Sequence, residues 1–210
     1  LKSSRVQGFK CSRVKRMSIR VIKTSDPGFE RALRKIVDRR GYRGEKIEKL
    51  VAEIIRTVRK KGDRALLYYT RLFDGVRLGK SGIEVGQKEM DRAMKIVPRE
   101  DLRVLRLAAK RIAAFHRRQL ERSWGYRDSL GLFLGQRITP LERVGVYVPG
   151  GKASYPSTVL MNVLPAKVAG VREVIMASPI GKDGALVLAA ARIAGVDRIF
   201  RIGGAQAISA

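Results

Sequence analysis

The feature that most constrains the fold is a regular alternation of short β-branched runs with Ala-rich and Leu-rich stretches after Gly131. Three runs are predicted as strands, and the two longer stretches between them are predicted as helices. In chain order these elements are 144–148, 157–168, 173–177, 185–194 and 198–202. Strand, helix, strand, helix, strand with short links is typical of a parallel sheet covered by helices, joined by right-handed crossovers. We therefore expect an α/β fold with a Rossmann-like βαβαβ sheet in residues 131–210.

Single residues refine this prediction. Ser157 is expected to cap the first of the two helices, and Pro165 is expected to kink or divide it. Gly195 is expected to end the second helix. A further strand is predicted over residues 132–137, before the alternation begins.

The region before Gly131 is charged and helical in pattern. Helices are predicted over residues 29–38, 45–61, 65–73, 87–96 and 99–122, with a turn over 41–44. Asp63 and Asp74 flank one of these helices, and we interpret them as caps or turn formers. Trp124, with Tyr126 nearby, is expected to lie in the core. We expect residues 17–130 to form a helical region that packs on the sheet.

The charge balance is strongly positive. Lys and Arg number 45 against 19 Asp and Glu, so the formal net charge is +26. Such a chain attracts anions, including nucleic acids and phosphorylated ligands. The basic residues are spread along the chain with acids between them, which favours solvated helix faces and would also suit surface ion-pair networks. No zinc-finger, RNA-recognition or helix-turn-helix pattern accompanies the charge, so specific nucleic-acid binding is not expected.

Cysteine content and hydropathy bear on the compartment. Cys11 is the single cysteine, so no internal disulfide forms, and a reducing cytoplasmic setting fits. No apolar run approaches the roughly 20 residues of a membrane span. Residues 1–16 are basic, contain no acids and lack an apolar core, so they are not a secretory signal. They fit a targeting peptide or, in our preferred interpretation, a leader that is disordered or not native, with Met17 as the natural start.

Two glycine-rich turns follow predicted strands, at the edge of an open α/β sheet where ligands bind. One contains Gly150, Gly151 and Lys152, and the other contains Gly203 and Gly204. Paired glycines let backbone N–H groups face an anion such as a pyrophosphate. They also suit tight strand-to-helix connections, and neither turn matches the strict dinucleotide fingerprint. The residues alone leave both interpretations open.

Metal chemistry finds little support in this chain. His116 is the only histidine, so no His-based metal cluster or His–His acid–base pair can be built. It follows Phe115 on the longest predicted helix, and we expect a packed or hydrogen-bonded structural role.

Several longer blocks, in order, resemble the histidinol dehydrogenase family. They include Glu142–Gly151, Tyr155–Asn162, Pro165–Val171 and Gly203–Ile208, and earlier Lys61–Leu66, Phe73–Val76 and Arg111–His116. The resemblance runs from about Ile19 to the end of the chain. Several ordered blocks are far more specific than one short motif.

The resemblance implies an NAD-dependent, zinc-containing homodimer that oxidises L-histidinol through an aldehyde to L-histidine, with two NAD per turnover. It assigns cofactor contacts to Tyr147 and Gln206, with Gly150 and Gly151 as backbone support. The family's catalytic Glu-His pair and zinc ligands, and a third cofactor contact, are expected beyond Ala210. On this basis residues 131–210 are the first part of an NAD-binding domain, and the chain is expected to be an inactive N-terminal fragment. A related dehydrogenase of another small alcohol is the alternative.

Overall fold

The computed structural model describes residues 21–38, 41–150, 154–181 and 184–210. The chain divides into one compact unit that ends at Lys49 and a second that begins at Leu50. Each unit is described by itself. Cys11 and all of residues 1–16, the region interpreted as a leader, lie outside the described residues.

The first unit contains helix α1 (Phe29–Val37) and the beginning of helix α2 (Gly41–Lys61). The expected helix over 29–38 is confirmed. The expected turn over 41–44 is wrong, because α2 begins at Gly41. Each glycine costs a helix about 1 kcal/mol, but extending an existing helix avoids the cost of nucleation, and the long run that follows favours extension.

In the second unit, α2 is followed by α3 (Asp63–Asp74), the 3₁₀ turn η2 (Lys80–Gly82), α4 (Gln87–Ile96) and α5 (Arg99–Arg117). A small cluster of Ile54, Val58, Ala65 and Tyr69 joins α2 to α3. Gly62, with φ +55°, precedes α3 at the cap position, so the expected capping by Asp63 is wrong. Asp63 lies in the first helical turn, where an acid still suits the helix dipole.

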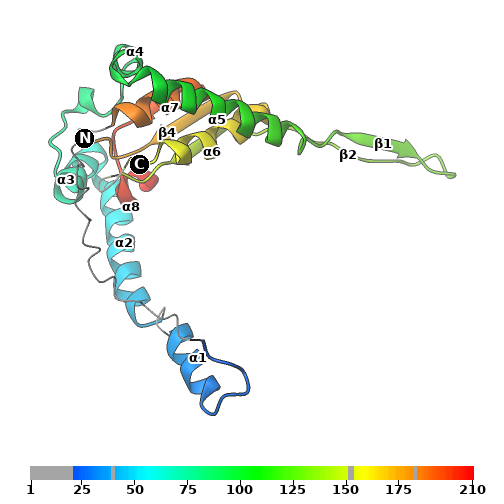
Figure 1. Ribbon diagram of the computed structural model, residues 1–210, viewed down its shortest axis with the longest axis horizontal. Helices are drawn as coiled ribbons and strands as arrows, with labels where there is room; N and C mark the ends of the chain where they lie inside the picture. Colours follow the sequence, from blue (N-terminus) through cyan, green and yellow to red (C-terminus); the bar gives the residue numbers. More distant parts are fainter. Residues whose placement is uncertain (1–20, 39–40, 151–153, 182–183) are drawn as a thin grey trace, which may run out of the picture. The chain divides into compact units, whose positions relative to one another are not determined.

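The predicted βαβαβ unit is confirmed. Strands β3 (Arg143–Tyr147), β4 (Glu173–Ala177) and β5 (Arg198–Phe200) form a parallel sheet in the order β3-β4-β5. Helices α6 (Pro156–Val168) and α7 (Ala185–Ala194) connect them, and α8 (Gly204–Ser209) follows β5. In Figure 1 these elements are coloured from yellow to red. Helix α8 lies near one end of the sheet and packs on α3.

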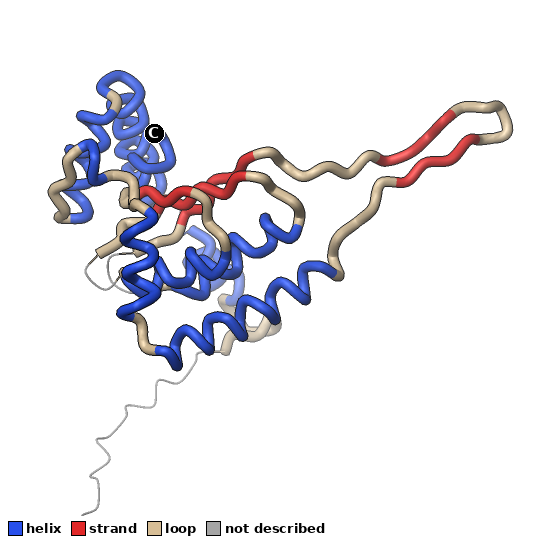
Figure 2. Tube along the Cα trace, turned by 90° about the horizontal axis from the view of Figure 1, so that it is seen from above, coloured by secondary structure: helices blue, strands red, loops and turns tan. Residues whose placement is uncertain are grey.

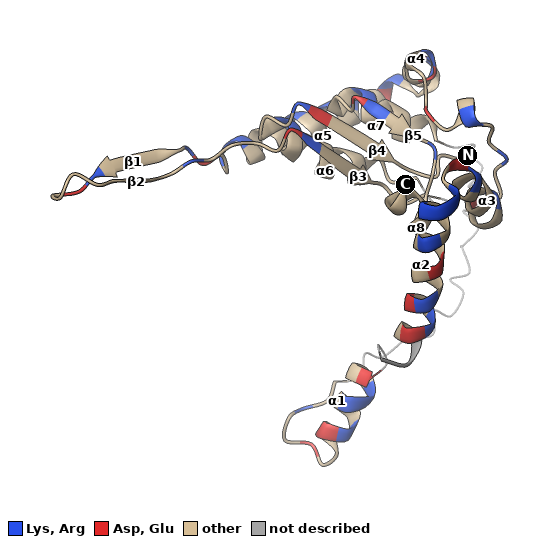
Figure 3. Cartoon of the chain, turned by 180° about the vertical axis from the view of Figure 1, so that it is seen from behind, with Lys and Arg blue, Asp and Glu red and all other residues tan. Residues whose placement is uncertain are grey.

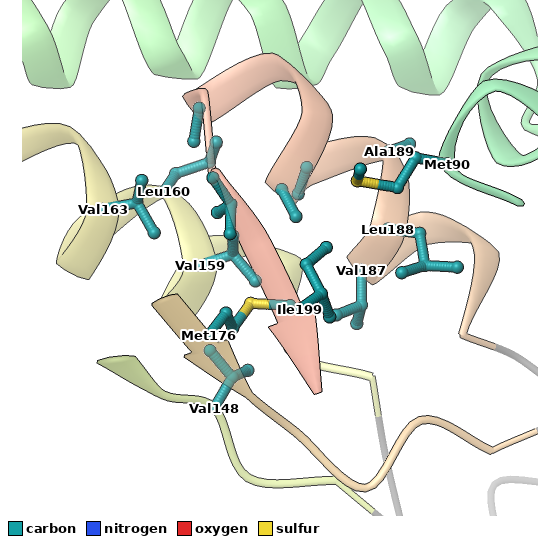
Figure 4. Close-up of a cluster of buried hydrophobic side chains, with 14 of the residues drawn as sticks. Met90, Val148, Val159, Leu160, Val163, Met176, Val187, Leu188, Ala189 and Ile199 are labelled. Carbon is teal, nitrogen blue, oxygen red and sulfur yellow. The ribbon is translucent and has the colours of Figure 1, made fainter. Parts of the chain in front are cut away.

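One face of the sheet carries the main hydrophobic core. Alternate strand residues point toward α6 and α7, as period-2 side-chain geometry requires. Helix α5 packs on both of these helices, and α4 packs on α7. Figure 4 shows the side chains that meet there: Met90, Val148, Val159, Leu160, Val163, Met176, Val187, Leu188, Ala189 and Ile199. Burial of these apolar groups is the main force holding the helices on the sheet.

The expected capping of α6 by Ser157 is wrong, because Tyr155 holds the cap position, with no side-chain cap bond. The expected division of the helix at Pro165 is also wrong, because α6 continues through Pro165, while a kink there stays a prediction. Pro156 occupies the first helical turn, where its missing N–H has no partner to lose. Burial of Val163 and Leu164 beside Pro165 keeps the helix continuous. The predicted end of α7 at Gly195 is confirmed, because that glycine adopts a left-handed conformation with φ +82°.

An antiparallel hairpin separates the helical region from the sheet. It consists of β1 (Trp124–Arg127) and β2 (Phe133–Gln136), and all eight strand residues are exposed. Figure 2 shows the hairpin extending away from the sheet and its helices. The predicted strand over 132–137 is thus confirmed, while α5 ends five residues before the predicted Arg122. Trp124 is 57% exposed, so the expected core position is wrong.

A short segment before α4 joins the helical region to the sheet edge. The backbone of Glu84 bridges to Phe200 in β5. The Glu84 carboxylate also receives two hydrogen bonds from Arg198, at 2.8 and 2.9 Å. These contacts lower the pKa of the Glu84 carboxyl, chiefly through the Arg198 hydrogen bond. Because the backbone of Glu84 pairs with that of Phe200, the segment extends the sheet beyond β5.

The positive charge is distributed over several elements. Along the first part of α2, Lys and Arg alternate with Glu, and its last turns carry only basic residues, as Figure 3 shows. In the part of the chain that is described, no helix is both long and apolar enough to cross a membrane.

Candidate functional site

Tyr147 ends β3 and connects two loops at the carboxyl edge of the sheet. Its hydroxyl accepts a hydrogen bond of 3.1 Å from the backbone N–H of Gly204, at the start of α8. The side chain remains 38% exposed. Tyr147, which is predicted as a cofactor contact, therefore also fixes the loop that leads to Gln206, the second predicted contact.

Gly204 has a conformation that other residues rarely adopt. Its φ is +64°, in the left-handed region. A Cβ atom at this position would lie 2.5 Å from Oε1 of Gln206. Glycine is thus required both by the backbone and by the close approach of the Gln206 amide.

Gln206 is a buried polar residue with unused hydrogen-bonding capacity. Its side chain has no solvent exposure, and neither Nε2 nor Oε1 has a hydrogen-bond partner. A free amide offers donors and an acceptor together. Buried groups of this kind are nearly always satisfied in folded proteins, so an amide left free at a sheet edge is a candidate for binding a ligand.

The loops after the three parallel strands meet around Pro179. A Cβ on Gly150 would lie 2.7 Å from the Pro179 carbonyl oxygen, and a Cβ on Gly203 would lie 2.8 Å from its ring. Close backbone packing therefore explains both glycines, in agreement with the tight-connection interpretation, and leaves ligand binding by Gly150 as a prediction. Gly151 and Lys152 lie outside the described residues.

A cavity of about 710 Å³ lies against the face of the sheet opposite the main core. Tyr147, at the end of β3, lies at its border with α8. The strand residues that line it are Gly145, Val146, Tyr147, Ile175, Ala177 and Phe200. Its size is within the usual range for small-molecule sites, and its wall is mainly apolar. The cavity could hold a flat ring system with its polar part directed to the sheet edge.

A second, smaller cavity of about 350 Å³ lies at the carboxyl edge itself. Thr70, Asp74 and Arg201 line it, together with Gly150 and Pro179. Burial raises the pKa of the Asp74 carboxyl. Sequence reasoning did not identify these three polar residues as site candidates. Thr70 and Asp74 lie on α3, which precedes the sheet by some 70 residues, and only the fold brings them to Arg201 at the end of β5.

No metal centre is formed by the described residues. They contain no group of three or more His, Cys, Asp and Glu side chains that could hold an ion. His116 lies near the end of α5, where Nδ1 is 2.6 Å from Oε1 of Gln119 and the ring meets Phe115 edge-on. His116 is hydrogen-bonded, as expected, and its structural role stays a prediction. The residues described do not fit a zinc ion, and no chemical step is assigned to one.

Comparison with known proteins identifies the relatives of this chain. The chain is 53% identical over 194 residues to the histidinol dehydrogenase of Syntrophotalea carbinolica, and 47% identical over 201 residues to that of Cupriavidus pinatubonensis. These matches cover 91% and 92% of this chain and 45% of each relative. The chain therefore spans about half the length of the curated relatives it matches.

A solved structure and a family model agree with these matches. The fold resembles the crystal structure of histidinol dehydrogenase from Elizabethkingia anophelis, with a TM-score of 0.72 and 31% identity over 78% of this chain and 38% of that one. The model of the histidinol dehydrogenase family matches residues 37–210. The chain belongs to the histidinol dehydrogenase family.

Proposed function

We propose that the protein to which these residues belong is an NAD-dependent enzyme that oxidises L-histidinol to L-histidine through the aldehyde. Family membership supports the reaction. The observation that carries the cofactor assignment is the buried, unpartnered amide of Gln206 beside the loop that Tyr147 holds. We further propose a cytoplasmic homodimer as the working form, with residues 131–210 as the first part of the cofactor-binding domain.

The described residues fit a dinucleotide at the carboxyl edge of the sheet. Gln206 offers donors and an acceptor for a polar group such as a carboxamide or ribose hydroxyl. Tyr147 presents an aromatic ring at the border of the apolar cavity. The backbone around Gly150 would approach the cofactor closely, with Gly151 extending the same turn in the sequence. When bound, NAD accepts a hydride from the alcohol and then from the aldehyde.

In this proposal the chain binds and orients the cofactor. The Tyr147 hydroxyl fixes the Gly204 backbone and so the start of α8, which carries Gln206. Packing of Gly150 and Gly203 on Pro179 keeps the three loops in one arrangement. Preorganisation of this kind reduces the free-energy cost of ordering the site when a ligand binds.

The test is a kinetic assay of the chain together with any coding sequence that continues it. We expect NADH to form from NAD⁺ and L-histidinol. Tyr147→Phe should weaken NAD⁺ binding by about 3–10-fold, because the Gly204 N–H loses its acceptor. Tyr126→Phe is the matched control, since Tyr126 lies in the exposed hairpin.

Two results would contradict the proposal in different ways. NADH formation with another small alcohol but not with L-histidinol would favour the related dehydrogenase. Equal NAD⁺ affinity in the Tyr147→Phe variant and in the wild type would remove Tyr147 from the cofactor site.

A further inference from the structure

Unsatisfied buried polar groups gather at one place in the molecule. In the described residues, buried side-chain nitrogen or oxygen atoms without a hydrogen-bond partner belong to Thr70, Asp74, Arg201 and Gln206. The first two lie in the second half of α3, Arg201 directly follows β5, and Gln206 lies in α8. Helices α3 and α8 pack on each other (Figure 1). Folded proteins leave few such groups, so their concentration at the ligand edge of the sheet indicates a binding function.

Three of these residues line the same cavity, the one of about 350 Å³. Thr70 is 1% exposed, and its hydroxyl is without a partner. Oδ2 of Asp74 and Nε of Arg201 are also buried and free. The cavity thus presents an acceptor, a donor and a hydroxyl that can act as either.

The geometry of Arg201 shows which of its atoms is available. One terminal nitrogen donates to both carboxylate oxygens of Glu89, at 2.6 Å each. This ion pair fixes the guanidinium and leaves Nε as the buried donor. Arg201 is therefore positioned by Glu89 and retains a hydrogen bond for another group.

The mixture of charges selects the chemistry of the ligand. Asp74 and Arg201 carry opposite charges, so their fields oppose each other and the cavity favours neither an anion nor a cation by net charge. A neutral hydroxyl can donate to the Asp74 carboxylate and accept from Arg201 Nε at the same time. A second, adjacent hydroxyl would satisfy Thr70. An acidic residue that binds ribose hydroxyls is a recurrent feature of dinucleotide sites at this edge of a sheet.

We propose that Thr70, Asp74 and Arg201 form a subsite for the vicinal hydroxyls of a ribose. The proposal rests on the proposed binding of NAD and deepens it, by assigning a second set of contacts on α3. The competing explanation is that ordered water alone satisfies the three groups, as water does in many buried polar cavities. If a ribose occupies the cavity, substitution of these side chains changes the affinity for NAD⁺. If water alone occupies it, the affinity stays the same.

The experiment compares NAD⁺ affinity by calorimetry in the wild type and two variants, Asp74→Asn and Thr70→Val, using the chain with any coding sequence that continues it. We expect each variant to bind NAD⁺ about 10-fold more weakly or worse, because Thr70→Val removes the hydroxyl and Asp74→Asn replaces a charged acceptor by a weaker neutral one. Thr70→Ser keeps the hydroxyl and should restore affinity. Asp101→Asn and Thr139→Val are matched controls at exposed positions and should bind as the wild type does.

Analogues of NAD⁺ that lack both hydroxyls on one ribose complete the test. The analogue that lacks the bound diol should bind weakly to the wild type and be insensitive to Asp74→Asn. The two analogues, one for each ribose, identify which ribose occupies the subsite. Melting temperatures of the ligand-free variants verify that each one is folded.

The outcomes separate the subsite from the function. Unchanged NAD⁺ affinity in both variants would show that only water occupies the cavity and would overturn the subsite, leaving the proposed function intact. Absence of NAD⁺ binding to the wild type would overturn the cofactor assignment and the subsite together. Equal loss of affinity for NAD⁺ and for both analogues would also overturn the subsite, because the effect would not depend on a ribose diol.

Discussion

Replacement of Gln206 by leucine should stabilise the ligand-free protein. The Gln206 side chain is fully buried, and both amide atoms lack partners. A buried polar group without a hydrogen bond costs about 1–3 kcal/mol. Leucine has a similar volume and no polar atoms, and a swap of similar volume causes little strain. The free energy of unfolding should therefore rise by about 1–3 kcal/mol.

The measurement is thermal unfolding with and without NAD⁺. For a chain of this size, each kcal/mol shifts the melting temperature by about 2–4 °C, so the Gln206→Leu variant should melt several degrees above the wild type. NAD⁺ should raise the melting temperature of the wild type by ligand linkage and leave that of the variant nearly unchanged. Gln136→Leu, at an exposed hairpin position, is the control and should stay within about 0.5 kcal/mol.

The opposite sign would refute this reasoning. If Gln206→Leu lowers the free energy of unfolding by more than about 1 kcal/mol, the amide has satisfied hydrogen bonds in the free protein, since breaking such bonds is what destabilises. An equal NAD⁺-induced shift in the variant and the wild type would separately remove Gln206 from the cofactor site.

Two further substitutions test the loop packing at the site and an ion pair at the amino edge of the sheet. Gly150→Ala places a Cβ 2.7 Å from the Pro179 carbonyl oxygen, so it should lower the free energy of unfolding by about 1–3 kcal/mol, measured by urea titration. Gly145→Ala is the control and should be neutral, because a Cβ there meets no atom within 4 Å. Burial raises the pKa of the Asp197 carboxyl, but hydrogen bonds from Lys167 and a β4 backbone N–H outweigh it and hold the pKa below its ordinary value. The stability from this carboxylate is present above the ordinary pKa and is lost as the pH falls through the lowered one, so Asp197→Asn should flatten acid unfolding curves in that range.

The sheet was predictable because its signal is local and repeated. Val174, Met176 and Ile199 lie in short apolar runs bounded by turn residues, and Ala-rich stretches of helical length separate the runs. Each strand must be buried on the side where its helices pack. The apolar runs that predict the strands therefore also predict that helices cover them. The left-handed Gly195 was predictable for the same reason, since it ends a periodic run.

The mistaken expectations about Trp124 and Pro165 share a physical cause, which is tertiary context. Trp124 and Phe133 have the residue types of a core, but they lie in a hairpin whose strands are fully exposed. Asp128 fixes the hairpin turn, because its carboxylate accepts from the N–H groups of Leu130 and Leu132 at 2.9 Å. Pro165 breaks helices in general, yet packing of its neighbours keeps α6 continuous.

The candidate site could be predicted only in part. Tyr147, at the end of β3, and Gln206, in α8, are predicted from family resemblance, because each lies in a sequence block of that family. Thr70 and Asp74 lie on α3, and nothing in their local pattern distinguishes them from helix-end residues. Whether their polar atoms have hydrogen-bond partners depends on the residues around them after folding. The spacing of residues along the sequence does not predict this.

The carboxyl edge of the sheet combines two kinds of residue with opposite effects on stability. Gly150 and Gly203 allow three loops to pack tightly on Pro179, which fixes the backbone. Thr70 and Gln206 place polar groups in the same region without partners, which destabilises the free protein. A rigid frame can hold such groups because the loops cannot collapse to satisfy them. A ligand that made the missing hydrogen bonds would recover the free energy lost in the unliganded state, so under our proposal the same groups that weaken the fold favour binding.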